Sequence, residues 1–169
     1  MINLNTKVKA EKSTGVDFSI PVPEGEYTCR VHEIKPWKEK TVAKITLSKT
    51  GEELTNVKIY NCGVVLEIVE GEYKGRRLFY NLTTHPNMPW IIPNFVYATG
   101  KEELTPAELT TECVGRYVKA VVIIEEKTIE KEDKNTGLVE EETKKVNTVK
   151  TVKESELNEN LVESDEFNV

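Results

Sequence analysis

The sequence predicts an all-β domain: a barrel of five or six strands, with a short helical insertion before a long closing β-hairpin. Short runs of alternating apolar and polar residues recur along the chain between turn residues. One stretch after residue 87 changes to helical spacing, and two long strand-like runs then follow. A length of 169 residues fits one such domain with polar extensions.

The ordered domain is expected over residues 21–153, after a flexible N-terminal segment of residues 1–20 that has no clear period. Pro21-Val22-Pro23-Glu24-Gly25 marks its beginning. In the first strand, Tyr27-Thr28-Cys29-Arg30-Val31-His32 alternates between apolar and polar residues, and Pro36 ends it. A second strand is expected over residues 41–48.

The middle of the chain predicts three further strand segments. Residues 57–60 and 64–70 are separated by Asn61-Cys62-Gly63, where a glycine within a strand pattern indicates a bulge or bend. Gly71-Glu72-Tyr73-Lys74-Gly75 forms a turn, and residues 76–83 return as a strand. Phe79 and Tyr80 are adjacent, so one of them and not both is expected in the core.

The helical insertion is expected over residues 87–99, ending at Gly100. Trp90 and Phe95 have helical spacing, which favours burial of both, although Pro93 conflicts with a continuous helix. Thr105 followed by Pro106 predicts the start of a second short helix. Strands over residues 115–130 and 140–152, joined by a turn, form the closing hairpin.

The charge of the chain is concentrated at its C-terminal end. There are 23 Lys and Arg against 29 Asp and Glu, a net charge of -6. Residues 154–169 hold six acidic residues and no basic one, so the rest has 29 − 6 = 23 acids against 23 bases. This segment is expected to be a disordered acidic tail.

The sequence offers no support for several function classes. It has no apolar run that could span a bilayer, and no signal peptide, so a cytoplasmic protein without membrane contact is expected. Three scattered cysteines and two histidines give neither a disulfide framework nor a metal motif. No nucleophile motif, phosphate loop or H-E-x-x-H is present, so we expect a protein that is not an enzyme and binds no cofactor.

Basic and aromatic residues are interleaved on strand faces predicted to point away from the core. Cations meet phosphates and aromatic rings stack on bases, so this mixture is typical of a groove for single-stranded nucleic acid. A structural role is the alternative for each residue, and the near-neutral body argues against a strongly basic footprint. The candidate DNA-binding residues are Trp37, Lys38, Lys44, Lys58, Tyr60, Tyr73, Lys74, Arg76, Arg77 and Phe79.

Three segments resemble a known family. They are Val22-Pro23-Glu24-Gly25-Glu26-Tyr27, the Tyr73-Lys74-Gly75-Arg76-Arg77-Leu78-Phe79 strand, and Gly115-Arg116-Tyr117-Val118 after the helical insertion. In this order they resemble the small phage-encoded single-stranded DNA-binding proteins with an OB-fold, over residues 22–150. The resemblance implies an OB-fold-like barrel and a role in phage replication or recombination, in the cytoplasm of the host cell.

The resemblance also implies a role for the tail. Single-strand binders of bacteria and phages often end in an acidic tail whose apolar tip docks on partner enzymes, and Asp165, Glu166 and Phe167 are similar in kind. The expected partners are therefore single-stranded DNA and replication or recombination proteins, with the chain acting as a monomer or homodimer. A tail that competes for the groove would make truncation after Lys153 tighten DNA binding.

One alternative belongs to another class: a β-barrel adaptor or inhibitor that contacts a host protein and binds no nucleic acid. It predicts that oligo-dT does not quench the fluorescence of Trp37 or Trp90.

Overall fold

The computed structural model describes residues 4, 5, 7 and 20–159. Most of the predicted N-terminal segment (residues 1–3, 6 and 8–19), and the tail residues Asp165, Glu166 and Phe167, lie outside the described residues. Within the described part, the elements are β1 (Gly25–Ile34), β2 (Lys38–Thr46), β3 (Glu53–Ile68), β4 (Arg77–Thr83), α1 (Ile91–Ala98), α2 (Pro106–Glu112), β5 (Tyr117–Glu132) and β6 (Val139–Glu154).

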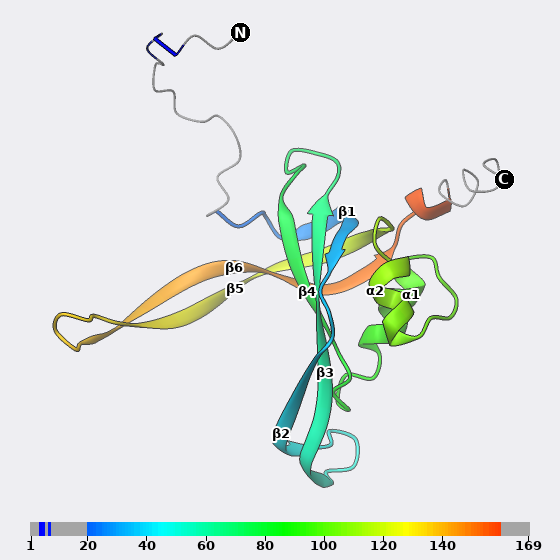
Figure 1. Ribbon diagram of the computed structural model, residues 1–169, viewed down its shortest axis with the longest axis horizontal. Helices are drawn as coiled ribbons and strands as arrows, with labels where there is room; N and C mark the ends of the chain where they lie inside the picture. The colour runs from blue at the N-terminus through cyan, green and yellow to red at the C-terminus, as the bar shows by residue number, and fades with distance from the viewer. Residues whose placement is uncertain (1–3, 6, 8–19, 160–169) are drawn as a thin grey trace.

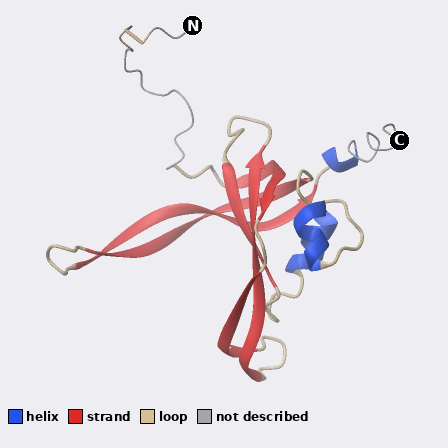
Figure 2. Cartoon of the chain, viewed as in Figure 1, coloured by secondary structure: helices blue, strands red, loops and turns tan. Residues whose placement is uncertain are grey.

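Six strands form one antiparallel sheet in the described part of the chain, in the order β2-β3-β1-β5-β6 with β4 beside β3. β1 and β2 follow one another along β3, pairing with residues 64–68 and 53–61 respectively. β4 pairs with β3 through Thr83 to Arg77, and β5 joins β1 to β6. The helices lie between β4 and β5, gathered on one side of the strands (Figure 2). The predicted fold class, an all-β OB-fold-like barrel with a helical insertion, is confirmed.

Alternation of apolar and polar residues explains which side chains of the central strands are buried. Cys29 and Val31 of β1 are fully buried, as predicted from the period of two. An irregularity falls at His32, because Val31 pairs with Leu66 and Glu33 with Val65. The bulge expected around Gly63 is wrong: β3 is continuous, and its pairing with β4 keeps one register across this glycine.

The positions of proline and of the N-cap residue explain where the two helices begin. α1 starts at Ile91 rather than residue 87, so Pro93 lies in the first turn, where a backbone N–H has no helical partner to lose. α2 begins as predicted with Thr105 as N-cap and Pro106 at the first position. The Thr105 side chain accepts from the Glu108 backbone N–H at 3.2 Å, and the Glu108 carboxylate accepts from the Thr105 N–H at 3.1 Å.

Two hairpins extend from the packed body in different directions (Figure 1). One is the far part of β2 and β3, and the other is the far part of β5 and β6, drawn yellow to orange. The core itself lies between β1, β3, β4, α1 and the inner half of β5 and β6, around side chains such as Leu66, Leu82, Phe95 and Val118.

The packed body continues past residue 153. Glu154 ends β6, and the side chains of Ser155 and Asn158 are buried. Asn158 accepts from the Tyr117 backbone N–H at 2.8 Å, and donates to the Tyr117 carbonyl at 2.6 Å and to that of Ala98 at 3.3 Å. The first residues of the predicted acidic tail therefore belong to the barrel.

Candidate nucleic-acid interface

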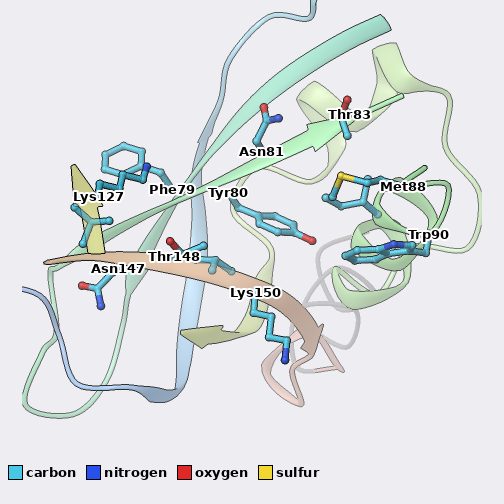
Figure 3. Close-up of a pocket in the computed structure, with 13 residues that line it drawn as sticks. Phe79, Tyr80, Asn81, Thr83, Met88, Trp90, Lys127, Asn147, Thr148 and Lys150 are labelled. Carbon is cyan, nitrogen blue, oxygen red and sulfur yellow. The ribbon is translucent and has the colours of Figure 1, made fainter. Parts of the chain in front are cut away.

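The barrel is open between β4 and β6. Both strands line one hollow, yet neither strand is hydrogen-bonded to the other in the described sheet. The hollow has a volume of about 480 Å³, with Phe79 and Trp90 at its two ends (Figure 3). A second hollow of about 260 Å³ continues past Phe79 between Arg77 and Lys145. We call the two together the β4–β6 groove.

Alternation along β4 determines which of its side chains are buried in the core and which are exposed. Leu78, Tyr80 and Leu82 point into the core, whereas Arg77, Phe79 and Asn81 are exposed. Phe79 is 67% exposed and Tyr80 only 6%, so the prediction that one of them would be buried is confirmed. The phenyl ring of Phe79 is therefore open to solvent, between the exposed side chains of Arg77 and Asn81 on the same face of β4.

The groove has a positive lining in a negatively charged chain. None of the described residues that line its two hollows is acidic, whereas Arg76, Arg77, Lys127, Lys145 and Lys150 are basic. The three lysines form no ion pair with any described residue. One carboxylate is close by, since Glu125 accepts a hydrogen bond from the lining residue Thr148 at 3.0 Å. The groove can therefore attract a polyanion despite the net charge of -6.

Residues before β1 pack beside the second hollow, which Pro21 lines. Val22 is fully buried, and the Arg76 guanidinium donates to the Ile20 carbonyl at 2.6 Å. Arg76 itself is buried, so its main contact is with the chain and not with solvent. Of the two adjacent arginines, Arg77 is the one exposed to solvent.

The predicted site residues fall into separate places. Arg76, Arg77 and Phe79 all line the groove. Lys38, Lys44 and Lys58 lie on the β2–β3 hairpin, where Lys44 pairs with Glu53 at 3.1 Å and Lys58 with Glu39 at 3.3 Å. These two lysines are partly neutralised and do not line the groove.

Tyr60 lies on the other side of the sheet from Phe79. β3 places Val65 opposite Phe79 and keeps its register from residue 53 to 68, so odd-numbered residues of β3 share the face of Phe79. Tyr60 and Lys58 are even-numbered, and their side chains leave the opposite face. With the predicted break at Gly63, the faces of Tyr60 and Phe79 could not have been compared along one strand.

The remaining aromatic candidates have contacts within the chain. The Trp37 indole donates to the Pro106 carbonyl at 2.8 Å and so ties the β1–β2 junction to α2. Tyr73 packs edge-on against Tyr27, with ring centroids 6.1 Å apart. Lys74 is exposed in the same turn as Tyr73 but does not line the groove.

Sequence reasoning missed four groove residues: Trp90, Lys127, Lys145 and Lys150. Trp90 was expected in the core, and this is wrong, because it is 47% exposed at the N-cap of α1. Lys127, Lys145 and Lys150 lie on the closing hairpin, where no local pattern distinguishes them from other lysines, and the approach of β6 to β4 brings them to the groove.

Burial controls the titrating groups around the groove and core. It raises the pKa of Tyr80 to about 12, of Cys29 to about 12 and of Cys62 to about 11, because ionisation would leave a charge in apolar surroundings. These groups are neutral at pH 7. In the described part of the chain, no three His, Cys, Asp or Glu side chains gather where they could hold a metal ion.

No family model matches the chain, and no curated protein or solved structure does either. None of the helices in the described residues has the length and apolarity required to cross a membrane.

Proposed function

We propose that this chain binds single-stranded DNA without sequence specificity, in the β4–β6 groove. The observation that carries the proposal is a groove without acidic lining residues that holds an exposed Phe79 between basic side chains. Stacking of a base on an aromatic ring contributes about 1–3 kcal/mol and tolerates any base, so a few rings suffice. Lysines along the rim supply contacts to phosphates.

The groove supports a single strand better than a duplex. Its rings can stack only on bases that are unpaired and splayed outward, and a duplex presents phosphates without such bases. The proposed role has no catalytic step and needs no cofactor: the protein coats transient single strands during phage replication or recombination.

The acidic C-terminal residues complete the proposal. Asp165, Glu166 and Phe167 are proposed to dock on a basic pocket of a replication or recombination enzyme. This would bring that enzyme to the coated strand without adding any contact to DNA.

The test is a titration of the full chain with oligo-dT, followed by tryptophan fluorescence. The indole of Trp90 lines the groove and that of Trp37 is bound to Pro106, so quenching is expected to come from Trp90. Trp37→Phe should keep the quenching and Trp90→Phe should remove it. The adaptor alternative predicts no quenching by either tryptophan, and tighter binding of duplex than of single strand would overturn the proposal.

A further inference from the structure

One buried side-chain polar atom in the described residues has no hydrogen-bond partner, and it is the hydroxyl oxygen of Tyr80. An unsatisfied buried hydroxyl costs about 1–3 kcal/mol, which a phenylalanine at this position would avoid. The ring of Tyr80 is well placed otherwise, since it packs against Phe95 with centroids 6.5 Å apart. The hydroxyl is therefore the part of this side chain that fold stability does not explain.

The hydroxyl lies in the larger hollow of the β4–β6 groove. Figure 3 shows the Tyr80 side chain reaching from β4 along the hollow, with its hydroxyl end toward Met88 and Trp90. Two other polar side chains of the lining have partners within the chain: the Thr83 hydroxyl accepts from the His85 N–H, and the Asn147 amide is bonded to Val22. Tyr80 alone presents a hydrogen-bonding group that is buried and unused.

The surroundings define the chemistry of the missing partner. Trp90 and Met88 offer flat or soft apolar surface, and Lys127 and Lys150 place positive charge at the rim. A ligand that fits all three features has a planar ring, a polar edge and a tethered anion. A nucleotide within a DNA strand has this combination, with the base as ring and edge and the phosphate as anion.

We propose that this hollow takes one unstacked nucleobase of the bound strand, which hydrogen-bonds to the Tyr80 hydroxyl and stacks on Trp90; this rests on the proposed function. Trp90 is the side chain that moves to admit the base. It is 47% exposed, its indole N–H makes no hydrogen bond to a described residue, and it provides no side-chain cap for α1. The base then supplies the partner that Tyr80 lacks.

The test compares the full chain with Tyr80→Phe for binding to (dT)n and to an oligomer of equal length that has abasic sites throughout. Loss of one hydrogen bond is expected to weaken (dT)n binding about 2- to 10-fold. Binding of the abasic oligomer should not change, since the hydroxyl meets the base and not the backbone. The variant should unfold at the same or a higher temperature, because it removes an unsatisfied group.

Trp90→Ala provides a second measurement at an exposed position, and it should weaken (dT)n binding about 5-fold or more with little effect on the abasic oligomer. Equal (dT)n affinity of Tyr80→Phe and the unchanged chain would overturn the base pocket and leave the proposed function standing. An equal loss on both oligomers would also overturn it. Failure of the unchanged chain to bind (dT)n would overturn both proposals.

Discussion

The side-chain amide of Asn147 takes the place of a strand partner for Val22. Its oxygen accepts from the Val22 backbone N–H at 2.8 Å, and its nitrogen donates to the Val22 carbonyl at 2.8 Å. Val22 is fully buried, so water cannot replace these bonds. One side chain of β6 thereby anchors the start of the domain at the end of the β4–β6 groove.

Asn147→Ala should destabilise the protein by about 1–3 kcal/mol, because it leaves a buried N–H and a buried carbonyl without partners. Thermal or urea unfolding measures this change. Asn81→Ala is the matched control, since Asn81 is exposed on β4 and its loss should change stability by less than about 0.5 kcal/mol. Equal stability of the two variants would contradict the anchoring role.

Phe79→Ala should weaken oligo-dT binding about 5-fold or more, because one stacking surface is lost. Tyr97→Ala is its control: Tyr97 is 62% exposed on α1, close to the exposure of Phe79, but it does not line the groove. In an anisotropy titration with oligo-dT, the affinity of Tyr97→Ala should equal that of the unchanged chain. Equal losses in the two variants would mean that the groove is not the binding surface.

Lys145→Ala should reduce the slope of log affinity against log salt concentration by about 1, as expected for the loss of one phosphate contact. Lys44→Ala removes the same charge from the β2–β3 hairpin, where the lysine pairs with Glu53. Its slope should equal that of the unchanged chain. A lower slope for Lys44→Ala alone would move the phosphate path to that hairpin.

Two truncations should distinguish the effect of the tail on binding from the effect of residues 154–159 on stability. A chain ending at Glu159 lacks Glu163, Asp165 and Glu166, and it should bind DNA more tightly and lose partner enzymes in a pull-down. A chain ending at Lys153 also lacks Asn158 and its bonds to Tyr117, so its melting temperature should fall. Unchanged affinity and pull-down after the shorter truncation would remove the tail from the proposal.

The cysteines should be unreactive in the native protein. Burial raises the pKa of Cys29 to about 12 and of Cys62 to about 11, so at pH 8 almost no nucleophilic thiolate is present. A thiol reagent should modify three groups per chain in denaturant and react far more slowly without it. Fast labelling of the native chain would contradict this burial.

The raised pKa values of Cys29 and Cys62 also predict how the stability of the fold changes with pH. In the unfolded chain these thiols ionise near their ordinary pKa of about 8.5, whereas the folded chain keeps them protonated. The unfolded state therefore binds fewer protons between pH 9 and the folded pKa values, and stability should fall as pH rises through this window. Unfolding midpoints measured from pH 7 to 11 check the direction.

Local patterns predicted much of the fold. The alternation around Cys29 predicted β1, and the Thr105-Pro106 pair predicted the start of α2. Because Phe79 and Tyr80 are adjacent in a strand, the sequence also predicted that only one of them would be buried. These inferences depend on neighbours in sequence, where propensity and capping act. The break expected at Gly63 was wrong, because a glycine permits a bulge but does not impose one.

The candidate site was harder to predict because it depends on which strands approach one another. Lys145 and Lys150 lie in a Lys-, Thr- and Val-rich strand pattern, and nothing local indicates that β6 lies across from β4. Trp90 followed helical spacing with Phe95, yet the helix starts one residue later, so that spacing does not bury it. Arg77 and Phe79 were predicted because both lie on one face of a single strand.

The open seam of the barrel also bears on how copies of the protein meet. In the described sheet, β4 and β6 each keep one edge without a strand partner, and bare edges invite pairing between molecules. Arg77, Lys145 and Lys150 set like charges along these edges, so two empty copies repel each other there. On the proposed function, a bound DNA strand would cancel that repulsion, and copies would then be able to lie side by side on the strand.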